Sequence, residues 1–195
     1  VFTYGLKTYS DYKTKILESS LEGMLLKINE NEFWTNLSGK FNAYNILAVF
    51  STASILGMPY NETLKMISML KSIKGRFEYL KLNDITAIID YAHTPDALKN
   101  IINSINDIKK NKESLITIIG CGGDRDKSKR ALMGDIASSL SSKVIFTSDN
   151  PRNESPESII KDMISGVKPV NSLKTMSISN RKEAIKTACQ LAQSN

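Results

Sequence analysis

The second half of the sequence alternates apolar strand patterns with helix patterns, and this alternation restricts the fold more than any other feature. Apolar runs at 115–119 and 144–147 each lead into a polar loop and then into a helical pattern. Consecutive units of this kind predict a right-handed, mostly parallel α/β sheet. Both polar loops would then lie at the carboxyl edge of that sheet, where open α/β sheets bind ligands.

Further strands and helices fit the same prediction. Residues 77–82 and 85–90 have strand patterns, and a last strand is predicted near 173–178. Thr94 and Ser155 each precede a proline, which predicts a helix N-cap with proline at the first helical position. Asn180 with Glu183 three residues later predicts a capping box at the start of a final helix, because the two residues have the required spacing.

The first part of the chain has a different pattern. Residues 1–38 predict short antiparallel strands with turns near Gly23 and 29–31. A helical period then begins at Lys40 and ends before Pro59, and a second helix is predicted with Asn61 as its cap. The segment at 73–75 reads as a linker, so we place a domain boundary there and expect domains at 1–74 and 75–195.

Composition excludes several classes of protein. The net charge is +6, but the lysines are spread along the chain and do not interleave with aromatic residues, so no nucleic-acid partner is expected. The two cysteines lack the spacing of metal ligands and the chain has a single histidine, so no zinc site is expected. No apolar run is long enough to cross a membrane and no leader pattern is present, so we expect a reducing, cytoplasmic setting.

Two polar loops carry both signs of charge. In the first, the sequence GCGGD is followed by Arg125 and Arg130, each of which can clamp a carboxylate with two hydrogen bonds. In the second, Asp149 and Asn150 suit an ammonium group and Arg152 suits a carboxylate. Together they predict a small zwitterionic ligand. The alternatives are a tight turn with its glycines at positive φ and an Asx-turn that caps the next helix.

Other polar residues suggest a nucleotide. Asp90 ends a predicted strand where a ribose hydroxyl would be accepted, and His93 lies just beyond it, before a helix N-terminus that attracts anions. Arg76 can reach a phosphate or be simply solvated. Asn42 and Asn45 offer the donor and acceptor pairs that an adenine edge requires, unless Asn42 only caps its helix.

The ordered motifs GKFNAYN, GRFE, DYAHTPD, GCGGDRDKSKR and DNPR resemble those of the Mur ligases, the ATP-dependent amino-acid-adding enzymes of peptidoglycan synthesis. The set is most similar to that of members which join meso-diaminopimelate to UDP-N-acetylmuramoyl-L-alanyl-D-glutamate. This resemblance implies that residues 1–74 are the end of a central ATP-binding domain. It also implies that residues 75–195 are most of a Rossmann-like C-terminal domain, truncated at its end.

The resemblance also implies residue roles. Asn42 and Asn45 would contact adenine, Asp90 the ribose, and Arg76 the phosphates, with His93 beside the nucleotide. The diaminopimelate would be held by Arg125, Asp149, Asn150 and Arg152. Lysine-adding members differ at the DNPR loop. In the family mechanism ATP phosphorylates the substrate carboxylate, and the incoming amine attacks the acyl phosphate to form an amide.

Several family motifs are missing from this sequence. It contains no GxxGKT/S phosphate loop, no lysine placed for carbamylation and no GKGHE segment. We therefore expect no catalytic residue and no metal ligand in this chain, Mg²⁺ ligands upstream of it, and no activity of the isolated chain. We expect a monomer. A lysine-adding Mur ligase and a non-catalytic nucleotide- or amino-acid-binding module remain the alternatives.

Overall fold

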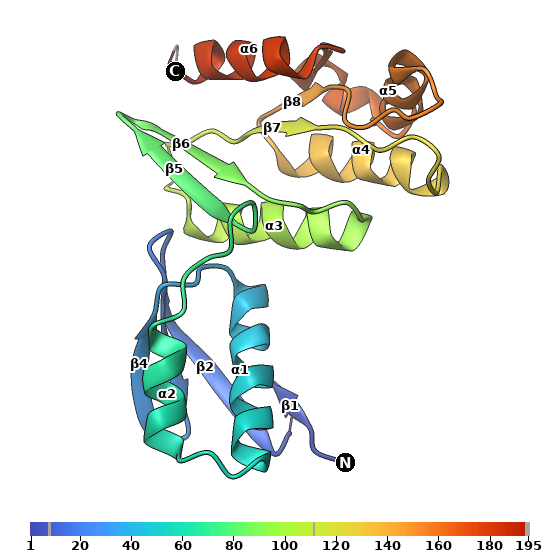
Figure 1. Cartoon of the computed structure of the whole chain (residues 1–195). Helices are drawn as coiled ribbons and strands as arrows, with labels where there is room; N and C mark the ends of the chain where they lie inside the picture. Colours follow the sequence, from blue (N-terminus) through green and yellow to red (C-terminus); the bar gives the residue numbers. More distant parts are fainter. Residues whose placement is uncertain (8, 111, 194–195) are drawn as a thin grey trace. The chain divides into compact units, whose positions relative to one another are not determined.

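The computed structural model describes residues 1–7, 9–110 and 112–193, and these divide into two compact units (Figure 1). The first unit comprises residues 1–80 and 88–91, and the second comprises residues 81–87 and 92–195. Each unit is described by itself below. The domain boundary near residue 75 stays a prediction.

The first unit contains a four-stranded sheet. Strands β2 (Tyr12–Ser19), β3 (Met24–Ile28) and β4 (Asn31–Thr35) are antiparallel, and β1 (Tyr4–Gly5) runs parallel to β2. Both turns lie where the sequence predicts them, and Asn29 adopts φ 52 in the second. Asparagine tolerates this left-handed conformation better than most residues. The predicted antiparallel pairing is therefore confirmed for β2, β3 and β4, and it is wrong for β1, which pairs with β2 in parallel.

Helices α1 (Lys40–Ile55) and α2 (Tyr60–Ser68) cover one face of this sheet. Alternate residues of β3 point toward them, as the period of two along a strand requires. The shared core consists of Met24, Leu26, Ile28, Ala43, Ile46, Leu47, Phe50, Leu64 and Ile67. The prediction of Asn61 as the cap of α2 is wrong. Pro59 holds the cap position in an extended conformation, and Asn61 lies inside the first turn.

Strands β5 (Glu78–Leu82) and β6 (Ile85–Ile89) pair with each other as a separate two-stranded sheet. Asn83 adopts φ 53 in the tight turn between them. The sequence pattern placed these strands in the parallel sheet, so that part of the prediction is wrong. A two-residue connection favours pairing of the two strands that it joins.

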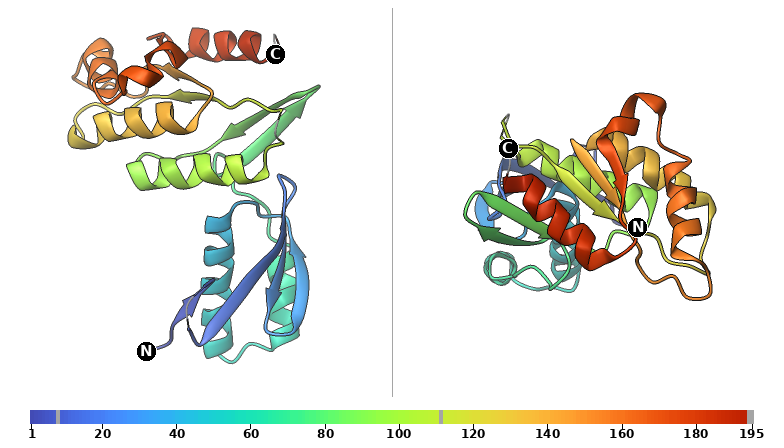
Figure 2. Two further views of the ribbon diagram at one scale, coloured as in Figure 1. Left: turned by 180° about the vertical axis from the view of Figure 1, so that it is seen from behind. Right: turned by 90° about the horizontal axis from the view of Figure 1, so that it is seen from above.

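The second unit is a three-layer α/β structure (Figures 1 and 2). Its parallel sheet has the order β7 (Ile116–Ile119), β8 (Lys143–Phe146) and β9 (Thr175–Ser177), and a 3₁₀ helix (Pro169–Lys174) precedes β9. Helices α3 (Pro95–Ile108), α4 (Ser128–Leu140) and α5 (Pro156–Ile164) pack on one face, and α6 (Arg181–Gln193) on the other.

Central strand β8 shows how the layers are held together. Val144 and Phe146 point into the core shared with α3, α4 and α5, whereas Ile145 points the other way, toward Ala184 and Ala188 of α6. All three β8 side chains are fully buried, which explains why the strand is apolar on both faces. The predicted α/β, Rossmann-like fold class is confirmed.

The local helix starts agree closely with the sequence. The hydroxyl of Thr94 accepts a hydrogen bond from the Ala97 backbone N–H at 3.3 Å, and Ser155 accepts one from Ser158 at 3.4 Å. At α6 only half of the predicted capping box forms. Asn180 accepts a bond from the Glu183 N–H at 3.2 Å, but the Glu183 carboxylate pairs with Lys186 at 2.9 Å.

Gly134 allows α4 and α5 to lie in close contact. A Cβ atom at this position would lie 1.9 Å from the Met163 carbonyl oxygen, which is backbone and cannot rotate away. We expect Gly134→Ala to lower the thermal midpoint of this domain, although alanine favours an isolated helix by about 1 kcal/mol. Leu132→Ala, at a position 57% exposed on the same helix, is the matched control and should have a small effect. An unchanged midpoint for Gly134→Ala would show that the helices separate without cost.

Candidate functional site

Two loops meet at the carboxyl ends of β7 and β8. We call residues 120–127 the first loop and residues 147–154 the second loop. The parallel register pairs Ile119 with Phe146, so both loops leave the sheet at the same edge. The Gly123 N–H donates to the Asn150 carbonyl at 2.8 Å, and a Cβ atom on Gly123 would lie 1.8 Å from the Pro151 carbonyl oxygen. The two loops therefore touch through their backbones.

The glycines of the first loop serve this contact. Positive φ angles occur at other glycines, and not at Gly120, Gly122 or Gly123. A Cβ atom on Gly120 would lie 2.5 Å from the Thr147 carbonyl oxygen. The alternative that these glycines supply positive φ is therefore wrong, and close approach of the second loop is the physical reason for them.

Arg130 lies beneath the two loops and is fully buried. Its guanidinium donates to Glu154 through Nη1 at 2.9 Å and Nη2 at 2.8 Å, and to Asp162 through Nη1 at 2.9 Å. The prediction that Arg130 clamps a ligand carboxylate is therefore wrong, because this chain's own carboxylates occupy it. Its Nε has no hydrogen-bond partner among the residues that the structure describes.

Glu154 connects the buried arginine to the first loop. It accepts a hydrogen bond from the Asp124 N–H at 2.6 Å and lies 3.2 Å from the Lys127 ammonium. The Arg130 guanidinium is the main cause that lowers the pKa of Glu154 to about 2, with the Asp124 N–H second. The carboxylates of Glu154 and Asp162 raise the pKa of Arg130, and desolvation lowers it. The carboxylates have the larger effect, so the pKa is raised overall. Sequence reasoning missed Glu154 and Asp162, although charged residues flanking the DNPR segment are a visible signal.

The lowered pKa of Glu154 predicts how this domain responds to acid. A carboxyl group whose pKa is lower when folded stabilises the protein above its ordinary pKa of 4.5, and that stability is lost as the pH falls toward about 2. We expect the thermal midpoint to fall across this window. Glu154→Gln, which cannot titrate, should show a flatter profile there. Parallel profiles for the two proteins would contradict the role of this group.

Both loops contain residues in the left-handed region. Asp124 has φ 51 and Arg152 has φ 50, a conformation that is uncommon for residues other than glycine. The Asn153 side chain donates to the Asp124 carboxylate at 2.8 Å and helps to hold the first of them. Residues kept in unfavourable conformations cluster at binding sites. The strain therefore lies at Arg152, one of the predicted ligand residues, and at Asp124, which precedes another, Arg125.

The structure brings the four predicted ligand residues onto these adjoining loops. Arg125, Asp149, Asn150 and Arg152 are all exposed. Arg152 Nη1 donates to the Gly123 carbonyl at 2.8 Å, which links its side chain to the first loop. Arg181 of α6, which sequence reasoning missed, lies 3.9 Å from the Asp149 carboxylate and donates to the Ser148 carbonyl at 3.2 Å. Neither Asp149 nor Asn150 caps α5, because Ser155 has that role.

In the first unit, two predicted adenine contacts lie in the first turns of α1. The Asn42 amide donates to the Ser38 carbonyl at 2.7 Å and accepts from Asn45 Nδ2 at 3.2 Å. The cap of α1 is Gly39, so Asn42 is not the N-cap residue. Asn45 is exposed and Asn42 is partly buried. The pair is thus pre-oriented, with Asn45 the more accessible.

Arg76 and Asp90 also belong to the first unit. The Arg76 guanidinium lies 4.6 Å from the centroid of the Tyr91 ring, a cation–π arrangement. The Asp90 carboxylate accepts the Phe77 N–H at 2.8 Å, and Phe77 adopts φ 46. The Phe77 ring packs edge to face against Phe41 at 5.5 Å, so this segment is attached to the start of α1.

His93 belongs to the second unit and is exposed. Its carbonyl accepts a hydrogen bond from Lys129 Nζ at 2.7 Å. Lys129 is in the first turn of α4, directly after the first loop. The His93 segment and the first loop are therefore physically connected within the second unit.

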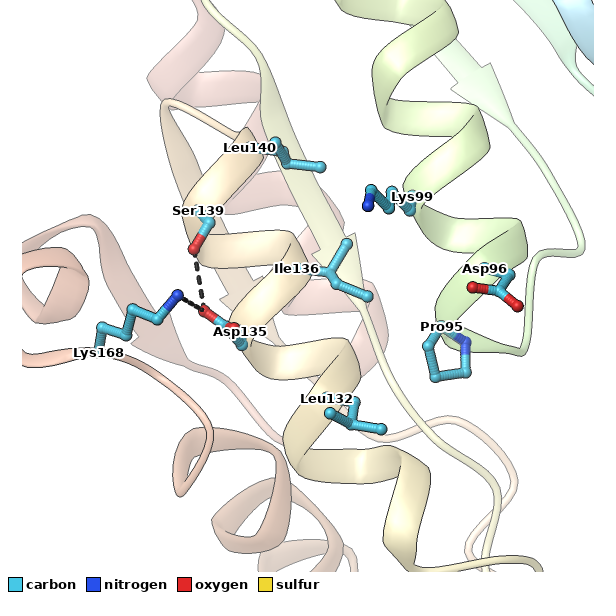
Figure 3. A pocket seen from close by; sticks show the side chains of 9 residues that line it. All are labelled: Pro95, Asp96, Lys99, Leu132, Asp135, Ile136, Ser139, Leu140 and Lys168. Carbon is cyan, nitrogen blue, oxygen red and sulfur yellow. Dashed lines mark hydrogen bonds and ion pairs between the residues drawn. The ribbon is translucent and has the colours of Figure 1, made fainter.

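A shallow groove of about 390 Å³ lies between α3 and α4, away from these residues (Figure 3). Asp135 in its wall pairs with Lys168 at 3.2 Å and accepts from the Ser139 hydroxyl at 2.9 Å. None of the predicted ligand residues lines it. Across residues 1–7, 9–110 and 112–193, no three His, Cys, Asp or Glu side chains gather to hold a metal ion, and no helix is suited to cross a bilayer.

Comparison with known proteins identifies the family. The sequence model of the protein family described as "Mur ligase, glutamate ligase domain" matches residues 75–195 of this chain. The chain belongs to the Mur ligase family. This match includes both loops and the whole parallel sheet. The resemblance seen in the sequence motifs is confirmed.

Individual relatives give a closer comparison. The chain is 48% identical over 194 residues to the UDP-N-acetylmuramoyl-L-alanyl-D-glutamate--2,6-diaminopimelate ligase of Bacteroides thetaiotaomicron, and 38% identical to the ligase of the same name from Halalkalibacterium halodurans. Each match covers 99% of this chain and 40% of the relative. The chain thus spans about 40% of the length of these curated relatives.

Solved structures of Mur ligases are also similar to this chain. A UDP-N-acetylmuramoyl-L-alanyl-D-glutamate--2,6-diaminopimelate ligase is 34% identical with a TM-score of 0.61, covering 95% of this chain and 39% of that one. MurF from Acinetobacter baumannii reaches a TM-score of 0.76 at 14% identity, covering 99% of this chain and 40% of that one. The second likeness shows the fold alone.

Proposed function

We propose that this Mur ligase chain is the C-terminal part of an enzyme that adds meso-diaminopimelate to UDP-N-acetylmuramoyl-L-alanyl-D-glutamate, with ATP as the energy source, in cell-wall peptidoglycan synthesis. The contact between the two loops is the observation that carries the proposal. It gathers two guanidinium groups, a carboxylate and an amide at the carboxyl edge of a parallel sheet, where ligands of open α/β sheets bind. Relatives 48% identical to the chain carry the corresponding name.

The charges on the loops match the proposed amino acid. Diaminopimelate carries two ammonium and two carboxylate groups. Arg125 and Arg152 are assigned to the carboxylates, because a guanidinium can hold a carboxylate with two parallel hydrogen bonds. Asp149 and Asn150 are assigned to an ammonium group, for which they offer acceptor oxygens. Lysine lacks the second carboxylate and would leave one arginine without a partner.

In the reaction, this chain would bind the incoming amino acid and orient its amine. The amine nitrogen of the amino acid forms an amide bond with the activated substrate carboxyl carbon, while the bond from that carbon to the phosphate oxygen breaks. Phosphate leaves, and the amine loses a proton. Held by both loops, the amino acid would present its amine in one orientation, which supplies much of the rate enhancement in two-substrate reactions.

ATP binding is proposed for a second set of residues. The exposed Asn45 with its partner Asn42 offers an amide pair for adenine, Asp90 an acceptor for the ribose, and Arg76 a positive charge for phosphates. His93 is proposed beside the nucleotide. The described residues of this chain hold no set of metal ligands, so Mg²⁺ would depend on residues upstream in the full-length protein. A monomeric state and a cytoplasmic location, which size-exclusion chromatography and cell fractionation test, complete the proposal.

The test is ATP-dependent amide formation by the full-length protein. We expect phosphate release that requires UDP-N-acetylmuramoyl-L-alanyl-D-glutamate and meso-diaminopimelate together, with lysine a much poorer substrate. The isolated chain of residues 1–195, which has no phosphate loop, should give no product. Equal rates with lysine would contradict the assigned amino acid. Absence of all amide formation by the full-length protein would favour a non-catalytic binding module.

A further inference from the structure

Gly122 lies beneath the side chain of Arg152. A Cβ atom built on Gly122 would lie 2.9 Å from Arg152 Nη1, closer than carbon and nitrogen atoms of this kind approach in proteins. The same Nη1 atom donates to the Gly123 carbonyl at 2.8 Å. The guanidinium is therefore seated against the bare backbone of Gly122. A side chain at that position would have to move it.

Among the residues that the structure describes, the Arg152 guanidinium is the one close neighbour at this position that a methyl group would displace. The next atoms are the Asn150 carbonyl oxygen at 3.7 Å and Arg125 Cγ at 3.9 Å, which are ordinary contact distances. Gly122 does not have a positive φ, so alanine fits its backbone. Gly123 differs, because a Cβ atom there would meet the Pro151 carbonyl oxygen at 1.8 Å. Of these two neighbours, only Gly122 can be changed without a backbone clash.

We propose that Gly122 is a positioning residue for amino-acid specificity: its missing side chain leaves the space in which the Arg152 guanidinium meets the second carboxylate of diaminopimelate. The inference rests on the proposed function. Gly122 does not touch the ligand, and it acts through the place that it gives to Arg152. A methyl group at 122 shifts the guanidinium and breaks its hydrogen bond to Gly123, while the charge of Arg152 remains.

The consequence is a selective loss of diaminopimelate recognition. A guanidinium moved by about 1 Å no longer forms two parallel hydrogen bonds to a carboxylate, and misplacement of this size costs about tenfold to a hundredfold in kcat/KM for diaminopimelate. Lysine has no second carboxylate for the Arg152 guanidinium to hold, so its slow use should be unchanged. The substitution therefore lowers the preference for diaminopimelate over lysine.

The experiment uses Gly122→Ala in the full-length protein. We expect KM for diaminopimelate to rise about tenfold or more, with kcat and the KM for ATP within about twofold of wild type and an unchanged thermal midpoint. Gly123→Ala is the structural comparison, and it should lower the midpoint. An unchanged KM for diaminopimelate in Gly122→Ala would overturn the inference.

A double-mutant cycle separates action through Arg152 from any other cause. In an Arg152→Ala background, Gly122→Ala should have no further effect on kcat/KM, because the group that it displaces is absent. Full additivity of the two substitutions would overturn the inference. Failure of the wild-type protein to use diaminopimelate would instead contradict the proposed function, so the two failures are distinguishable.

Discussion

Arg152→Ala is expected to lower kcat/KM for diaminopimelate in the full-length protein by about a hundredfold, the loss of roughly 3 kcal/mol from a charge-assisted contact. The residue is exposed on the second loop, and its side chain reaches the first loop at Gly123. Removal of the guanidinium leaves a carboxylate of the ligand without its partner. Steady-state kinetics with varied diaminopimelate measure the effect.

The control for this prediction is Lys182→Ala, which removes a positive charge from the exposed side of α6. It should change kcat/KM by less than about twofold, because a fully solvated charge without an ion-pair or hydrogen-bond contact to the ligand is screened. Arg152→Lys keeps the charge but loses the planar fork, and we expect it to remain well below wild type. Unchanged kinetics for Arg152→Ala would remove the substrate assignment.

Arg130→Met is expected to destabilise the domain by about 3 kcal/mol, since removal of one partner of a buried ion pair leaves the other uncompensated. Arg130 is fully buried, and it holds Glu154 and Asp162 together. Hydrogen exchange of the α4 amides in the full-length protein measures the change as a roughly hundredfold faster opening. Activity should also fall, because the first loop depends on Glu154 for its geometry.

Two comparisons make this prediction specific. Arg125→Met removes an exposed arginine five residues earlier and should leave exchange unchanged. Adding Glu154→Gln to Arg130→Met removes one of the stranded charges, so the double variant should be more stable than Arg130→Met alone. A double variant that is less stable than Arg130→Met would contradict the ion-pair account.

Local features of the fold could be predicted from the sequence. The caps at Thr94 and Ser155 depend on atoms three residues apart, so the signal and its partner lie in the same short stretch. The central strand β8 could also be predicted, because both of its faces are buried and residues 144–146 therefore form a continuous apolar run. By contrast, the strand patterns of β5 and β6 predict membership of the parallel sheet, whereas the two strands pair with each other. Pairing between strands depends on tertiary contacts that a strand pattern does not contain.

The sequence predicted that residues of the two loops would lie together, but it did not predict the contacts between them. Arg125 and Arg130 have the same chemistry and lie in the same charged run, yet one is exposed and the other fully buried. The difference arises from Glu154, which is 24 residues further along the chain. Gly120 and Gly123 likewise have close backbone neighbours in the second loop, and Gly122 has the Arg152 side chain. Such long-range partners are visible only once the chain is folded.

The most direct test is a crystal structure of the full-length protein with meso-diaminopimelate bound. The account predicts the amino acid against residues 120–127 and 147–154, with Arg125 and Arg152 within hydrogen-bond distance of its carboxylates. It also predicts Asp149 or Asn150 at an ammonium group. Diaminopimelate bound away from these loops, or bound beside them without contact to Arg152, would contradict the central claim.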